Sequence, residues 1–268
     1  MLNRALIYAL RRQGKEITNI DELNFYRNFY RNLDSTSLVY SQLPQEKREL
    51  IAPFLPYSKS QLGQDLFALA FAGSTSPKFF VEFGATDGVS LSNTWLLEKK
   101  LGWNGILAEP AKTWHNALAK NRNCNIDARC VAKQSGLKYQ FLEVDNCESG
   151  SPELSSIEAY ANNGDWASNI RTSNSNRYEV ETISLNDLLD QHNAPKDIQF
   201  LSLDTEGSEL EILQGYDFAK RSIWSICVEH NYVEKTRHAT QTLLAEKGYN
   251  RVLQQISKFD DWYVLGRN

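Results

Sequence analysis

The sequence lacks the patterns that mark several large classes of protein. It has no excess of basic residues, because 29 Lys and Arg stand against 33 Asp and Glu and give a formal net charge of -4. That balance provides no electrostatic footprint for nucleic acid, so we expect no nucleic-acid partner. The longest early apolar stretch, from Ala5 to Leu10, is too short to span a bilayer. We therefore expect no transmembrane segment.

Informative cysteine and nucleotide motifs are also missing. We interpret the cysteines as reduced thiols, because they form no CxxC pair and no zinc-binding spacing, and this predicts a cytoplasmic protein. The sequence has no Walker lysine motif and no three-glycine GxGxxG turn, so ATP and nicotinamide dinucleotides are poor candidates for its ligand. The four cysteines are Cys124, Cys130, Cys147 and Cys227.

The pattern of the sequence changes near residue 57. Residues 1–57 combine helical spacing of apolar residues with several prolines, which predicts a helical N-terminal arm. Residues 58–268 alternate apolar, strand-like runs with helical patterns. This alternation predicts one α/β domain whose mostly parallel sheet is covered by helices on both faces. The predicted strands are 78–83, 104–109, 124–132, 198–204 and 223–230.

Two segments depart from this alternation. At the end of the chain, YNRVLQQI (249–256) and WYVLG (262–266) are separated by a short turn, which predicts an antiparallel hairpin. Residues 147–178 are rich in Ser, Asn, Gly and Glu and show no clear period. Such a segment is either a binding excursion on the substrate side of the domain or a plain flexible insertion.

Acidic residues follow four of the predicted strands, and they are Glu82, Glu109, Asp204 and Glu229. Ligands of open parallel sheets bind outside the carboxyl ends of the strands, so we expect these acids to surround one site. Paired carboxylates would repel a pyrophosphate, but they can accept hydrogen bonds from an amine or from ribose hydroxyls. The pattern therefore favours S-adenosylmethionine over NAD or ATP as the ligand.

Several motifs in a fixed order resemble the FkbM family of S-adenosylmethionine-dependent methyltransferases, over roughly residues 58–265. The resemblance implies a class I methyltransferase (Rossmann-like) fold, with a seven-stranded, mostly parallel sheet and one antiparallel strand. It also implies methyl transfer to an oxygen, on a hydroxyl of a saccharide or secondary metabolite. The motifs are SQLGQD (60–65), FVEFGATDGVSLSNT (80–94), GWNGILAEP (102–110), VETISLNDLL (180–189), LSLDTEGSELEILQG (201–215) and CVEHNY (227–232).

The same resemblance implies a set of residues that bind the cofactor. Glu109 is expected to hold the ribose, and Asp204 is expected to lie beside the methionine end of the cofactor and the acceptor. The full set is Gln61, Asp65, Glu82, Gly84, Asp87, Gly88, Ser92, Asn93, Glu109, Pro110 and Asp204.

An alcohol that attacks a methyl group must lose its proton, so the reaction needs a general base. The candidates are His230 and Asp204, with Glu206 third. A divalent metal held by Asp204, Glu229 and His230 is a less favoured alternative to metal-free catalysis. A second alternative is a catalytically inactive nucleoside-binding or assembly module of the same fold. The partner is a small-molecule or saccharide acceptor, and the aromatic residues of the arm leave a homo-oligomer contact open.

Overall fold

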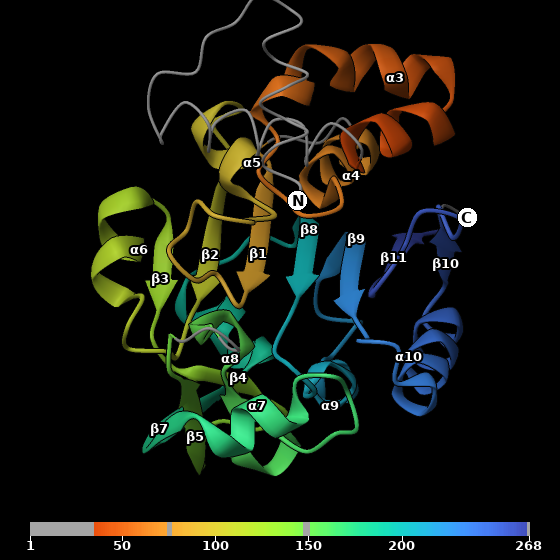
Figure 1. The fold of residues 1–268 in the computed structure, drawn as a ribbon. Helices are drawn as coiled ribbons and strands as arrows, with labels where there is room; N and C mark the ends of the chain where they lie inside the picture. The colour runs from red at the N-terminus through yellow and green to blue at the C-terminus, as the bar shows by residue number, and fades with distance from the viewer. Residues whose placement is uncertain (1–34, 74–76, 147–150, 267–268) are drawn as a thin grey trace, which may run out of the picture.

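A mixed α/β fold with two sheets is formed by residues 35–73, 77–146 and 151–266, which the computed structural model describes (Figure 1). The predicted α/β class is confirmed. The main sheet has the strand order β10-β11-β9-β8-β1-β2-β3, and a smaller sheet has the order β4-β7-β5-β6. The main sheet contains β1 (Phe79–Phe83), β2 (Asn104–Ala108), β3 (Asn125–Asp127), β8 (Asp197–Leu203), β9 (Ser222–Glu229), β10 (Tyr249–Val252) and β11 (Asp260–Leu265). The smaller sheet contains β4 (Cys130–Ala132), β5 (Lys138–Val144), β6 (Ser156–Ile157) and β7 (Ser175–Ser184).

The direction of the strands creates the edge at which a ligand can bind. Strands β3, β2, β1, β8 and β9 are parallel to one another, whereas β11 is antiparallel to both β9 and β10. The carboxyl ends of β1, β2, β8 and β9 therefore share one edge of the sheet. Figure 1 shows their arrowheads directed toward the smaller sheet and helix α7 (Ser168–Ser173).

The central strands β1, β8 and β9 are buried on both faces, because helices cover both. In β1, Phe80 packs into a cluster on one face, while Val81 packs into a second cluster on the other face. The first face is covered by α4 (Gln64–Phe71), α5 (Trp95–Lys99) and α6 (His115–Asn121). The second face is covered by α8 (Leu185–Gln191), α9 (Glu209–Gly215) and α10 (Glu234–Glu246).

The described part of the N-terminal arm is helical and packs on α4. Residues 35–42 are helical, and α3 (Gln45–Ile51) and the 3-10 helix η1 (Ala52–Tyr57) follow. Val39, Leu43 and Ile51 are buried in the same cluster as α4. The predicted helix content of residues 1–34 lies outside the described residues, and the division at residue 57 stays a prediction. Among the described helices none is both long and apolar enough to cross a membrane.

Two expectations about the middle of the chain were wrong. The predicted single strand 124–132 is two short strands in different sheets, because the carboxylate of Asp127 accepts the backbone N–H of Arg129 at 2.9 Å and turns the chain. The sequence analysis also missed β5 and the sheet it forms. The segment 147–178 is no plain insertion where it is described, since it contains η2 (Pro152–Leu154), β6, η3 (Glu158–Tyr160) and α7.

The packing of α4 on the sheet generates the first prediction. The ring of Phe67 is fully buried, with its centroid 5.1 Å from those of Trp262 and Phe71. We expect Phe67→Ala to lower the free energy of unfolding by about 3–5 kcal/mol, because it removes an aromatic side chain from a closed core. Leu137→Ala is the control, because Leu137 is 39% exposed and should cost about 0.5 kcal/mol or less. Equal losses in urea unfolding would contradict this account of the core.

Candidate functional site

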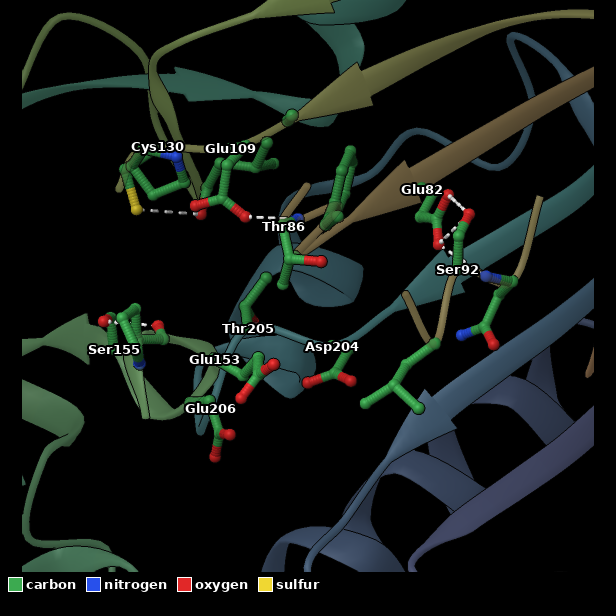
Figure 2. Close-up of a pocket in the computed structure, with 18 of the residues that line it drawn as sticks. Glu82, Thr86, Ser92, Glu109, Cys130, Glu153, Ser155, Asp204, Thr205 and Glu206 are labelled. Atoms are coloured by element: carbon green, nitrogen blue, oxygen red, sulfur yellow. Dashed lines mark hydrogen bonds between the residues drawn. The ribbon is translucent and has the colours of Figure 1, made fainter. Parts of the chain in front are cut away.

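A cavity of about 920 Å³ lies at the carboxyl ends of β1, β2 and β8. Its walls come from the turn after β1, the end of β2, the smaller sheet, the segment 152–157 and the turn after β8. Five carboxylic acids line it, and Figure 2 shows them: Glu82, Glu109, Glu153, Asp204 and Glu206. The predicted meeting of acids at one edge therefore holds for three of the four strand-end acids. Glu229, the fourth, is outside this lining.

Glu109, directly after β2, is buried but keeps hydrogen-bonding capacity toward the cavity. One carboxylate oxygen accepts the backbone N–H of Thr86 at 2.8 Å, and the other accepts the backbone N–H of Ala111 at 2.8 Å. Each oxygen of a carboxylate can accept about two hydrogen bonds, so each keeps one lone pair for a ligand. Burial raises the pKa of Glu109 to about 7, although these two N–H groups oppose the shift. Glu109 can therefore bind a pair of hydroxyl groups once it is ionised.

Glu82, at the end of β1, uses its carboxylate for hydrogen bonds to other residues of the protein. Its carboxylate accepts the Ser92 hydroxyl at 3.0 Å, the backbone N–H of Asn93 at 2.7 Å and the Thr94 hydroxyl. The guanidinium of Arg122 lies 3.7 Å away. Burial raises the pKa of Glu82, and the charge of Arg122 opposes that rise. Glu82 thus ties the loop after β1 to the sheet, and it leaves little capacity for a ligand.

The loop after β1 also places a hydrogen-bond acceptor without a partner in the cavity lining. Asn93 donates from Nδ2 to the hydroxyl of Ser202 at 2.9 Å. Its Oδ1 atom is buried and has no hydrogen-bond partner among the described residues. A buried acceptor without a partner is costly, so a ligand that donates a hydrogen bond there would relieve the cost. An ammonium or hydroxyl group fits this atom.

Gly84 allows the turn after β1 to approach the turn after β8. Its φ is +72°, and a Cβ atom at this position would lie 2.3 Å from the carbonyl oxygen of Asp204. Only glycine tolerates both conditions. The residue therefore brings the two turns together at the cavity. Pro110 and Ser92, two further predicted cofactor residues, also line it.

Of the remaining predicted cofactor residues, one lines the cavity and the others do not. Gln61 lines it and is exposed. Asp65 is fully buried outside the lining, where its carboxylate accepts the hydroxyls of Ser58 and Ser60 at 2.7 Å each. The buried Gln64, next to it, lines the cavity instead and donates to Asp260 at 2.7 Å. No sequence pattern distinguishes Gln64 from Asp65 as the residue that faces the cavity.

Asp87 and Gly88 form the turn after β1 but do not line the cavity. The carboxylate of Asp87 accepts the backbone N–H groups of Val89 and Ser90 at 2.8 and 2.7 Å, so it closes its own turn. Gly88 has a φ of +77°, and a Cβ there would contact the side chain of Arg122 at 2.6 Å. Both residues therefore shape the loop, and their contact with a cofactor stays a prediction.

Three acids form a cluster at the wall of the cavity: Asp204 and Glu206, which line it, and Glu229, which does not. One oxygen from each lies within 4.8 Å of the other two, a spacing that could hold a metal ion. Burial and then the mutual repulsion of these acids raise the pKa of Asp204 and of Glu229 well above the ordinary range. Burial raises the pKa of Glu206 to about 7 against the opposing charge of Arg171.

His230 is outside this cluster, and the ligand set of Asp204, Glu229 and His230 stays a prediction. The Nδ1 atom of His230 accepts the backbone N–H of Tyr232 at 3.0 Å, and Nε2 lies 3.5 Å from a carboxylate oxygen of Asp261. The ring lines two smaller pockets on the β9 side and not the main cavity. The third acid of the cluster is Glu206, where the sequence analysis expected His230.

Arg171, which the sequence analysis missed, connects this cluster to the wall of the cavity. Its side chain is fully buried and bonds to Asp165 at 2.8 Å, to the carbonyl oxygen of Leu154 at 2.8 Å and to Glu206. Leu154 lies between the lining residues Glu153 and Ser155. No motif marks this arginine, because it lies in a segment without a sequence period.

The arginine network generates the second prediction. We expect Arg171→Met to lower the free energy of unfolding by about 3–5 kcal/mol, because it leaves two buried carboxylates without their cation. Arg177→Met is the matched control, since Arg177 pairs with Glu158 where the side chains are 60% and 40% exposed. Loss of that exposed pair should cost about 1 kcal/mol or less. Urea unfolding at neutral pH measures both, and similar losses would show that the Arg171 network contributes little.

Part of the sequence matches a known family of methyltransferases. The family model described as Methyltransferase FkbM domain matches residues 82–251, more than half of the chain. A comparison with curated proteins finds no match. The crystal structure of methyltransferase FkbM from Methylobacillus flagellatus KT aligns with 97% of this chain and 70% of its own, at 12% sequence identity and a TM-score of 0.46. On the strength of the family match, which includes the turns after β1, β2, β8 and β9, the chain belongs to the FkbM methyltransferase family.

Proposed function

We propose that the chain is an S-adenosylmethionine-dependent O-methyltransferase, and that the cavity at the ends of β1, β2 and β8 binds the methyl donor. The observation that carries the proposal is a pair of available hydrogen-bond acceptors in the lining: Glu109 keeps free lone pairs, and the Oδ1 atom of Asn93 has no partner among the described residues. These groups suit ribose hydroxyls and an ammonium group respectively. The fold is then of the class I methyltransferase type, with a domain at 58–268 and an arm at 1–57.

The donor supplies an activated methyl group on a sulfonium, so the protein's task is to align it with the acceptor. Glu109 would fix the ribose, and Asn93 would fix the amino group. Gly84 lets the turn after β1 come close to the donor and to Asp204. Glu82 would act indirectly, by holding Asn93 in place through its backbone N–H.

Asp204 is the general base that we propose for the acceptor hydroxyl. It lines the cavity, and its raised pKa makes the carboxylate a stronger proton acceptor than an ordinary aspartate. Glu206 also lines the cavity, but Arg171 and Asn231 already bond to its carboxylate. His230 is the weakest candidate, because its ring is outside the lining.

We propose that the reaction needs no metal ion. A divalent ion between Asp204, Glu206 and Glu229 would compete with Arg171 for the carboxylate of Glu206. An added chelator should therefore leave methyl transfer unchanged, and restoration of a lost activity by Mg²⁺ or Mn²⁺ would favour the metal-dependent alternative.

The acceptor in this proposal is a hydroxyl of a saccharide or secondary metabolite, methylated in the cytoplasm. The alternative function is a nucleoside-binding module that has lost methyl transfer. Calorimetric titration with S-adenosylmethionine separates binding from no binding at all. Release of S-adenosylhomocysteine with a panel of hydroxyl acceptors then separates the enzyme from the module.

The raised pKa of Glu109 generates a pH prediction for donor binding. The ionised carboxylate accepts hydrogen bonds more strongly than the protonated form. Since its pKa is about 7, donor affinity should increase several-fold from about pH 6 to about pH 8. We expect Glu109→Gln to weaken binding by about tenfold or more and to remove this increase. Calorimetry with S-adenosylhomocysteine at both pH values measures it, and an unchanged pH dependence in the variant would exclude Glu109 as its source.

The base assignment is tested by comparing two substitutions. Asp204→Asn should lower kcat by about 100-fold or more, because an amide cannot take the proton, while donor binding changes little. His230→Gln should lower kcat by less than about tenfold, because His230 lies outside the cavity lining. Both variants are assayed by S-adenosylhomocysteine release, with calorimetry as the control for donor binding. If His230→Gln lowers kcat more than Asp204→Asn does, His230 is the general base.

A further inference from the structure

Three acids lie together on the side of the cavity where the methyl acceptor would bind. Glu153, from the wall 152–157, lines the cavity together with Asp204 and Glu206 from the turn after β8. Figure 2 shows these three carboxyl groups gathered on one side of the cavity, and Glu82 and Glu109 apart from them. Among the described lining residues there is no lysine, arginine or histidine.

The two arginines behind the lining each pair with one lining acid, Glu82 or Glu206, and the other three lining acids form no ion pair with the described residues. Arg122 has a fully buried side chain that bonds to Glu98 at 2.5 Å and lies 3.7 Å from Glu82. The buried guanidinium of Arg171 is bonded to Asp165, Leu154 and Glu206, as described above. Neither cation is free to bind an anionic ligand. A sulfonium donor in the cavity would offset one negative charge only.

We infer that this site takes an acceptor that is neutral or cationic around the reacting group, and that Glu153 is the residue that rejects anionic acceptors. The inference rests on the proposed function and narrows its substrate class. A phosphate or carboxylate on the acceptor would lose its water and meet like charges without a compensating donor, which is strongly unfavourable. Hydroxyl and ammonium groups instead offer hydrogen bonds that the three carboxyl groups can accept.

Glu153 is the best of the three acids for a test, because it is the most exposed and the least embedded. It is exposed, in contrast to Asp204 and the buried Glu206, and its carboxylate accepts the hydroxyl of the nearby Ser151. A change at Glu153 therefore alters the charge of the wall without removing a buried ion pair or the proposed base.

The experiment uses the full chain and matched sets of methyl glycosides: a hexose, its uronic acid and its 2-amino derivative. Release of S-adenosylhomocysteine gives kcat/KM for each member. We expect the hexose and amino sugar to exceed the uronic acid by at least about tenfold. Glu153→Lys should raise the ratio of uronic acid to hexose by at least about tenfold, and Glu153→Gln should give an intermediate ratio. Glu246→Lys is the control, since it makes the same charge change at an exposed site on α10.

The outcomes separate this inference from the proposed function. Failure of the donor to bind would refute the proposed function itself. Donor binding and turnover with a preference for the uronic acid, or an equal response to Glu153→Lys and Glu246→Lys, would overturn the charge inference alone. A second measurement needs no turnover: the thermal stability of the protein loaded with S-adenosylhomocysteine, with each sugar added. Greater stabilisation by the uronic acid, or binding of no member at all, would also overturn the inference.

Discussion

The structure depends on one constraint: buried carboxyl groups at a sheet edge must each find a hydrogen-bond donor or a cation. An isolated buried charge is too costly to keep, so every such acid determines the position of the groups around it. Glu82 determines the path of the loop after β1, through bonds to Ser92, Asn93 and Thr94. Glu206 determines the position of the cavity wall, through Arg171. The cavity is therefore shaped by the partners of its acids.

Some of this arrangement could be predicted from the sequence because the signal is local. An acid directly after an apolar run marks the end of a strand, and parallel strands bring such ends together whatever the loops between them contain. That reasoning is sufficient to place Glu82, Glu109 and Asp204 around one cavity. It also explains the α/β class, because a strand buried on both faces is apolar along most of its length, as the fully buried β1 is apart from Glu82.

The rest could not be predicted, because it depends on partners far apart in the sequence. Thr86, which donates to Glu109, lies 23 residues before it, and Arg171 lies 35 residues before its partner Glu206. The smaller sheet was missed for a related reason. Strand β5 pairs with β7, more than thirty residues later across an irregular segment, and its half-buried pattern gives a weaker signal than the buried strands of the main sheet.

The site is held by two buried arginines, one behind each half of the cavity. Arg122 supports Glu82 and the loop that presents Asn93, and Arg171 supports Glu206 and the wall that carries Glu153. Among the described residues the two networks share no hydrogen-bond or ion-pair partner, so substitutions in one half should have effects independent of the other. In the proposed function, the first half binds the donor and the second half binds the acceptor.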